Sequence, residues 1–382
     1  MDVLIARCAG LDVHKKTVVA CVRRVGPEGV AVEETRTFGT MTDDLLALAD
    51  WLASEGVTHA AMESTGVYWK PVWHLLEGRF DLTLVNARHM RQVPGRKTDV
   101  KDAAWIAQLL AHGLLSKSFV PPEPIRELRD LTRQRAQLVA DKATVANRLQ
   151  KVLEDANIKL AGVATDVLGA SGRAMIARMI GGEDDPHALA DEARGRLKKK
   201  VIPLRRALSG RVTTHHRFQL RLLMDQVRNL EALIARLDGR IAEVMGPLAQ
   251  AAARLETIPG VGARAAEVIV AEIGADMSQF PTAGHLASWA GLCPGNNESA
   301  GKRRTGRTTK GSVWLRATLV QVAWAASHTK RTILAARYRS LAKRLGKKKA
   351  LVALGHKILR IIYEMLSHQT DYVERLDPGL AA

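Results

Sequence analysis

Cysteines and long apolar runs are scarce in this chain, and each shortage excludes a class of protein. The three cysteines, Cys8, Cys21 and Cys293, are scattered without a CxxC pair. This argues against a disulfide framework and against a cysteine zinc site, and suits a reducing compartment. No apolar run reaches the ~18 residues that a membrane span requires, and the N-terminus lacks the basic n-region and cleavage site of a signal peptide. We therefore expect a cytoplasmic protein with no membrane partner.

Aromatic side chains make up only 4% of the residues, and three tryptophans, Trp289, Trp314 and Trp324, lie in the C-terminal region. Aromatic rings can stack on unpaired bases in proteins that bind single-stranded nucleic acid. The helical spacing of the apolar residues around these three favours packing in a core instead. The same reasoning makes the lone histidines His14 and His74 structural residues rather than ligands.

Acidic side chains are scarce only towards the C-terminus. The 382 residues carry a formal net charge of +18. Residues 1–110 contain 13 basic and 14 acidic side chains, whereas residues 300–382 contain 18 basic and 4 acidic ones, an excess of 14 positive charges. A nearly neutral N-terminal part and a strongly basic C-terminal part predict chemistry in the first and nucleic-acid binding in the second. The alternative is a merely supercharged surface of the ribosomal type.

Residues 1–118 alternate strand and helix patterns. Five strands and three helices are predicted in the order β-β-β-α-β-α-β-α, which is typical of an α/β domain with a mixed sheet. This order places the first and fourth strands side by side near the centre of the sheet. The proline-rich segment that begins at Phe119 ends the domain.

Residues 119–255 are predicted to form a long helical, coiled-coil region. Two stretches, at about 125–160 and 213–255, carry apolar residues at helical spacing and are too long and too charged for ordinary packed helices. They indicate an antiparallel helical pair or a dimerising coiled coil. A polar loop and a short helix are expected between them.

Residues 256–382 are predicted to form a basic, mainly helical domain. It opens on a helix–hairpin–helix pattern, Ile-Pro-Gly-Val-Gly, at residues 258–262. Gly260 and Gly262 leave the backbone bare at a helix N-terminus, where N–H groups and the helix dipole favour a phosphate. Glycines in a turn between helices are also common without any ligand.

Four carboxylates in the N-terminal domain occupy positions that indicate a metal site. Asp12 lies in the apolar stretch of the first strand, Glu63 ends the fourth strand, and the last helix holds Asp99 and Asp102 on one face. Four converging carboxylates repel each other without a cation, and Mg²⁺, with Mn²⁺ as the alternative, is the natural oxygen-liganded ion. Such ions assist phosphoryl transfer. Separate structural roles for each acid, such as serving a helix dipole, are the competing interpretation.

Two groups of basic residues are candidate phosphate contacts. The first group lies beside Asp99. The second lies in the run Asn296–Gly311, NNESAGKRRTGRTTKG, which we call the serine loop. Cations in these positions would hold a phosphate backbone and stabilise a pentavalent transition state. The residues are Arg96, Lys97 and Lys101 beside Asp99, and Lys302, Arg303, Arg304, Arg307 and Lys310 in the serine loop.

Ser299 stands at the head of the serine loop. A serine hydroxyl is a weak nucleophile at its own pKa and needs activation by a base or a metal. Nothing within the loop supplies a base, so the best activator is the upstream carboxylate cluster with its metal. If that activation is missing, Ser299 is only a residue of a solvated turn.

Five motifs in order carry a resemblance over nearly the whole chain: GLDVHKK, MESTGVYW, KTDVKDA, IPGVG and ESAGKRRTGRTTKG. They resemble those of the DEDD transposases of bacterial insertion sequences, which are guided by a bridge RNA. The first three match the family's RuvC-like (RNase H-like) domain, and the last two match its C-terminal transposase domain. Many members have Gly directly after the serine, whereas this chain has Ala300 followed by Gly301.

The resemblance assigns the four metal-binding acids to Asp12, Glu63, Asp99 and Asp102, and the catalytic serine to Ser299. It implies a Mg²⁺-dependent recombinase that forms a transient 5′-phosphoserine link and exchanges the strands of donor and target double-stranded DNA. The implied partners are a structured guide (bridge) RNA and further copies of the chain, as a homodimer that pairs into a tetramer on DNA.

Two other functions compete with this one. A metal-dependent endonuclease of the Holliday-junction type would use the same acids but cut with water. A non-enzymatic nucleic-acid-binding protein would use the acids only structurally.

Overall fold

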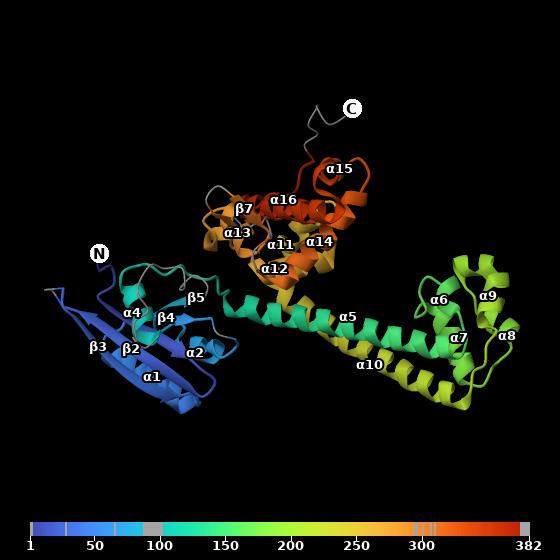
Figure 1. Ribbon diagram of the computed structural model, residues 1–382, viewed down its shortest axis with the longest axis horizontal. Coiled ribbons are helices and arrows are strands. Elements are labelled where there is room, and N and C mark those ends of the chain that lie inside the picture. The colour runs from blue at the N-terminus through green and yellow to red at the C-terminus, as the bar shows by residue number, and fades with distance from the viewer. Residues whose placement is uncertain are drawn as a thin grey trace. The chain divides into compact units, whose positions relative to one another are not determined.

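A computed structural model of the chain describes residues 3–26, 29–64, 66–86, 102–293, 297–299, 302–305, 308 and 311–374. The chain divides into two compact units, Met1–Val120 and Pro121–Ala382, which we call the N-terminal and C-terminal units (Figure 1). None of the helices in the described part of the chain is long and apolar enough to cross a membrane. The finer division at residues 118 and 255 stays a prediction.

A five-stranded mixed sheet in the order β3-β2-β1-β4-β5 forms the N-terminal unit. The strands β1 (Arg7–Val13), β2 (Thr17–Val25) and β3 (Ala31–Gly39) pair antiparallel, whereas β4 (His59–Glu63) pairs in parallel with β1 and with β5 (Asp81–Val85). This is the strand order of the RNase H-like fold. The predicted α/β domain, with its first and fourth strands adjacent, is confirmed.

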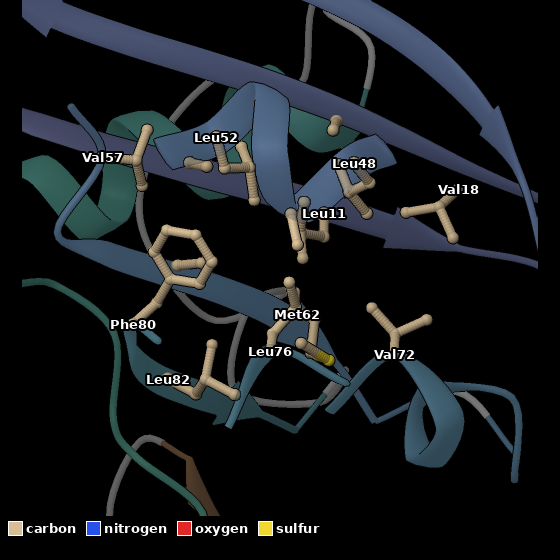
Figure 2. Packing of buried hydrophobic residues seen from close by; sticks show 14 of the residues in the cluster. Leu11, Val18, Leu48, Leu52, Val57, Met62, Val72, Leu76, Phe80 and Leu82 are labelled. Carbon is tan, nitrogen blue, oxygen red and sulfur yellow. The ribbon is translucent and has the colours of Figure 1, made fainter. Parts of the chain in front are cut away.

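The main core of this unit lies between one face of the sheet and two helices, α1 (Thr42–Ser54) and α2 (Trp69–Leu76). Side chains alternate between the faces of a strand, so Leu11 of β1 and Met62 of β4 both point to this side. Figure 2 shows them among the side chains that fill the core, which include Val18, Leu48, Leu52, Val57, Val72, Leu76, Phe80 and Leu82.

The opposite face of the sheet is covered by α4 (Asp102–Ala111). Gly10 of β1 allows this helix to approach closely, because a Cβ at Gly10 would lie 2.1 Å from the carbonyl oxygen of Ala103 and 2.4 Å from the amide nitrogen of Ala107. Both atoms are backbone, so neither can move aside without displacing the helix.

A pair of long antiparallel helices, α5 (Glu123–Asp155) and α10 (Thr214–Met245), opens the C-terminal unit (Figure 1). Ion pairs between them join Arg135 to Asp238 at 2.5 Å, and Lys142 to Glu231 at 3.4 Å. Of the two arrangements that the sequence allowed, the antiparallel pair within one chain is therefore present. A role in dimerisation stays a prediction.

A small helical bundle joins the two long helices. It has a core of its own, which contains Met175, Ile176 and Met179 and continues onto Leu149 and Leu220 of the long helices. The predicted polar loop and short helix are present at residues 181–190, but the sequence analysis made no prediction for the other helices, which are too short to show a sustained apolar period. The helices of the bundle are α6 (Leu160–Val163), α7 (Ala170–Ile180), α8 (Pro186–Ala190), the 3-10 helix η1 (Gly195–Lys200) and α9 (Val201–Leu208).

The rest of the unit is mainly helical, as predicted. The helix–hairpin–helix element comprises α11 and α12, which Gly260 and its neighbours connect. The elements are η2 (Gly246–Leu248), α11 (Ala249–Glu256), α12 (Ala263–Ile273), η3 (Met277–Gln279), α13 (Ala283–Trp289), β6 (Asn297–Ser299), β7 (Lys302–Thr305), α14 (Val313–His328), α15 (Ile333–Leu345) and α16 (Lys347–His368).

Trp324 contradicts the prediction that the C-terminal tryptophans pack in the core. Its side chain is 59% exposed, and its ring lies 4.5 Å from that of His328 on the same face of α14. The buried stripe of this helix contains Leu319, Val322 and Ala323, which leaves Trp324 on the outer side. Trp289 is partly buried and packs against Phe280, as expected.

We expect Gly10→Ala to lower the free energy of unfolding of the N-terminal unit by roughly 1–3 kcal/mol, because the added methyl group forces α4 away from the sheet. The matched control is Gly26→Ala, since a Cβ there would meet only the Val30 carbonyl oxygen at 3.9 Å. Urea denaturation of both variants measures the difference. Equal stability of the two variants would show that α4 is not held by close approach at Gly10.

Candidate active site

Asp12 and Glu63 leave the sheet at neighbouring positions. The paired register of the parallel strands β1 and β4 ends with Leu11 opposite Met62, and the two acids are the next residues of their strands. Neighbouring strands lie ~4.8 Å apart. Ala61 packs against α4, and a Cβ at Gly10 would also meet α4. Asp12 comes two residues after Gly10, and Glu63 comes two residues after Ala61, so both acids are on the same face of the sheet as α4. The two carboxylates therefore lie on that face, at one end of the sheet.

The third described acid, Asp102, is the first residue of α4. The helix runs antiparallel to β1, because the Cys8 thiol donates to the Ala107 carbonyl at 3.4 Å while Gly10 contacts Ala103. Ala103 also packs near Val19, the residue paired with Asp12 across the β1–β2 ladder. The first turn of α4 consequently lies at the end of the sheet where Asp12 and Glu63 emerge.

His14 is a neighbour of Asp12 that the sequence analysis had counted as structural. Its Nε2 lies 3.0 Å from Asp12 Oδ2, and its side chain is 58% exposed, so it does not belong to a core. The sequence did contain one signal for this contact. His14 follows Asp12 by two residues, and side chains two residues apart in an extended chain lie on the same side.

A metal ion at this end of the sheet would meet carboxylate oxygens. Cys8 is no ligand, because burial under α4 raises the pKa of its thiol to about 11. Within the described residues, no three or more His, Cys, Asp and Glu side chains are grouped closely enough to hold a metal. Asp99 and the flanking cations Arg96, Lys97 and Lys101 lie outside those residues. The chemistry of the three described acids fits Mg²⁺ or Mn²⁺.

The serine loop contains a short β-hairpin, where the sequence analysis had expected an irregular basic loop. Ser299 ends β6, and its backbone is paired with that of Lys302 at the start of β7. Ala300 and Gly301, which stand between Ser299 and Lys302 in the sequence, lie outside the described residues. Lys302, Arg303 and Arg304 are consecutive residues of β7, and Arg307 and Lys310 lie outside the described residues.

The two predicted phosphate-binding glycines differ in their surroundings. Gly260 has φ +93°, and a Cβ there would lie 2.5 Å from the Ala326 amide nitrogen and 2.8 Å from the Val322 carbonyl oxygen. Close packing against α14 therefore accounts for this glycine without a ligand. Gly262 is exposed at the N-terminus of α12, and a Cβ there would meet nothing within 4 Å. Phosphate contacts at these glycines stay predictions.

Two segments match known families of transposases. Residues 9–158 match the family DEDD_Tnp_IS110, described as "Transposase", and thus span the sheet, the described acids and α5. Residues 252–339 match a second family, described as "Transposase IS116/IS110/IS902 family", and span the helix–hairpin–helix element and the serine loop.

Two relatives that match about three quarters of this chain are named for insertion elements. The "Insertion element IS110 uncharacterized 43.6 kDa protein" of Streptomyces coelicolor is 28% identical over 324 residues, 75% of each chain. The "Transposase for insertion sequence element IS1111A" of Coxiella burnetii is 26% identical over 299 residues, 76% of this chain and 72% of that one. A shorter match, 28% over 162 residues, links 40% of this chain to 49% of the "Pilin gene-inverting protein" of Moraxella bovis.

The first family match contains most of the RNase H-like sheet, where Asp12 and Glu63 lie at one end, and the second lies within the C-terminal unit. Transposases act on DNA by phosphoryl transfer, which agrees with those acids and with the basic C-terminal part. The chain therefore belongs to the IS110 family of insertion-element transposases.

Proposed function

We propose that this transposase is an RNA-guided recombinase that cuts and rejoins DNA through a 5′-phosphoserine link to Ser299. The observation that carries the proposal is the position of Ser299 at the end of β6, paired with the first of three consecutive cations in β7. A hydroxyl carried on the same hairpin as several cations suits attack on a phosphodiester, since cations balance the charge that develops on phosphorus oxygens.

The cleavage step would exchange one ester for another. The Ser299 oxygen attacks the phosphorus, the new bond joins that oxygen to the 5′-phosphate, and the bond from phosphorus to the 3′ oxygen breaks. The serine proton passes to a carboxylate of the acid set, and the departing 3′ oxygen takes a proton from water. Attack by the 3′ hydroxyl of another strand on the phosphoserine then rejoins DNA and frees the serine. Top and bottom strands react in turn.

The residues that would hold the divalent ion are Asp12, Glu63, Asp99 and Asp102. A bound Mg²⁺ or Mn²⁺ supplies activation of an oxygen nucleophile and charge neutralisation at the phosphate. The protein's own contribution is geometric, because the β1–β4 register and the docking of α4 bring Asp12, Glu63 and Asp102 to one end of the sheet. The acids that accept the proton of a given Ser299 would come from the same subunit or from another subunit.

Nucleic-acid binding would involve the cations around both halves of the site. The hairpin cations and the helix N-terminus after Gly262 would contact phosphates of DNA. The proposed contacts are Arg96, Lys97, Lys101, Gly260, Gly262, Lys302, Arg303, Arg304, Arg307 and Lys310. Further partners are a structured guide RNA, and a second copy of the chain, with dimers that pair into tetramers in the cytoplasm.

A second function is supported by the N-terminal unit alone. An RNase H-like sheet with acids at one end can direct water at a phosphodiester, as an endonuclease of the Holliday-junction type would do. The acids would then be essential and Ser299 dispensable. The two functions differ in whether the protein becomes linked to DNA.

Replacement of Ser299 separates the two mechanisms. We expect Ser299→Ala to reduce strand exchange on a plasmid that carries the element by on the order of 10³-fold, because no other group forms the covalent link. Protein bound covalently to DNA, seen as a shifted band after denaturation, should also disappear. The control is Ser288→Ala, which alters an exposed serine of α13. Undiminished exchange by Ser299→Ala would refute the serine mechanism.

Replacement of the acids tests the metal site. We expect Asp12→Asn and Asp102→Asn each to lower the rate of strand cleavage by on the order of 10²- to 10⁴-fold, and chelation of Mg²⁺ by EDTA to abolish it. Asp50→Asn is the control, because Asp50 is an exposed acid of α1 paired only with Arg79 at 2.7 Å. Cleavage that survives all three treatments would favour a structural role for the acids.

Purification with its nucleic acid tests the guide and the oligomer. We expect a structured RNA from the element's non-coding end to copurify, because duplex RNA is held through its shape and backbone. Nuclease treatment should abolish strand exchange until that RNA is added back. Light scattering should show at least a dimer with RNA. A monomer that recombines DNA without RNA would contradict both proposals.

A further inference from the structure

Glu272, near the end of α12, is the one charged residue in the described part of the chain that is completely buried, at 0% exposure. A carboxylate can be buried in this way only if other groups replace its water. Arg133 of α5 supplies two parallel hydrogen bonds, from Nε to Oε1 at 2.8 Å and from Nη2 to Oε2 at 2.9 Å. This bidentate pairing fixes both the position and the plane of the carboxylate.

A second arginine of α5, Arg129, strengthens the same attachment. It donates from Nε to the Ala271 carbonyl at 3.2 Å and from Nη2 to the Glu272 carbonyl, both in the last turn of α12. A cation is favourable at a helix C-terminus. Burial lowers the pKa of Arg129 to about 10, partly offset by the charge of Glu272, so the side chain stays protonated at neutral pH. The long helix α5 is therefore attached to α12 through two charged side chains.

The remaining bond of the Glu272 carboxylate leads to the serine loop. Ser312 donates from Oγ to Glu272 Oε2 at 2.8 Å. Ser312 Oγ also accepts a hydrogen bond from the Leu315 amide at 3.2 Å. Ser312 is thus the N-cap of α14. It also follows directly on Gly311, the last residue of the serine loop.

The C-terminal end of the serine loop contacts the end of α13 beside this bond. A Cβ at Gly311 would lie 2.3 Å from the carbonyl carbon and 2.4 Å from the carbonyl oxygen of Ala290, and 2.4 Å from the Gly291 nitrogen. The backbone that leaves α13 and the backbone that enters α14 are therefore in direct contact. Ser312 holds this junction to Glu272.

We propose that Glu272, Arg133 and Ser312 are positioning residues, which hold the C-terminal end of the serine loop and thereby the β6–β7 hairpin that carries Ser299. The proposal rests on the proposed function, because it assigns the network to the placement of that serine. Buried ion pairs add little stability compared with apolar residues of similar volume. Their directional bonds select one arrangement of α5, α12 and α14, and a nucleophile displaced by about 1 Å can lose on the order of 100-fold in rate.

The decisive comparison is between Ser312→Ala and Thr332→Ala. Thr332 is the N-cap of α15, where its hydroxyl accepts from the Ala335 amide at 3.2 Å and donates to the Thr329 carbonyl at 3.1 Å. Both variants remove a helix cap with one accepted and one donated bond, but only Ser312 is bonded to Glu272. Loss of cap stability alone should therefore affect them alike.

We expect Ser312→Ala to slow formation of the covalent protein–DNA link by roughly 10- to 100-fold at saturating DNA. Its affinity for DNA should stay within about twofold of the unaltered protein, and Thr332→Ala should retain the full rate. Ser312→Thr keeps the hydroxyl and should restore the rate, since threonine is also a good N-cap. Equal rates for Ser312→Ala and Thr332→Ala would overturn the positioning role.

Amide hydrogen exchange of the hairpin, residues 297–305, separates failure of this proposal from failure of the serine mechanism. Faster exchange there in Ser312→Ala, but not in Thr332→Ala, supports the positioning of the hairpin by Glu272 whatever the nucleophile is. Unchanged exchange in both variants overturns it. If Ser299→Ala still recombines DNA, the proposed function fails, and the exchange measurement alone decides whether the network holds the hairpin.

Discussion

The close approach of α4 to β1 at Gly10 is the constraint on which the N-terminal unit depends. With no Cβ in the way, the backbone of Ala103 and Ala107 reaches the sheet directly. The register of β1 against β4 then brings Asp12 and Glu63 to one end of the sheet, and the helix brings Asp102 to the same end. A larger residue at position 10 would move the helix, and the acids would no longer emerge together.

In the C-terminal unit, hydrogen bonds made by charged side chains, rather than close backbone packing, fix how the helices are arranged. Glu272 is buried where α5, α12 and the start of α14 meet, and each of its partners comes from one of these helices. Because hydrogen bonds are directional and apolar contacts are not, such a network favours a single arrangement of the helices. The serine loop ends at that arrangement, where Gly311 touches Ala290.

Much of the fold could be predicted, because strand alternation and helical spacing are local patterns, and the strand positions of Asp12 and Glu63 follow from them, whereas their role in a metal site stays a prediction. The strands of the sheet contain sustained apolar runs, and an aspartate inside such a run is conspicuous. The hairpin at Ser299 gave no such signal, since β6 and β7 are only three and four residues long and polar throughout. Trp324 was misassigned, and the contact between His14 and Asp12 was not foreseen, because exposure and partnership depend on neighbouring elements. Glu272 was overlooked in an apolar helix for the same reason.

The sequence by itself determined the kinds of elements, their order, the charge difference between the two parts and the residue types available for phosphoryl transfer. These follow from periodicity and composition, which every short segment carries in itself. Only the tertiary structure decided that Gly260 serves packing against α14 and that Ser312 bonds a buried carboxylate on α12. Such contacts join residues far apart in the chain, and they depend on shape and burial, which no local pattern records.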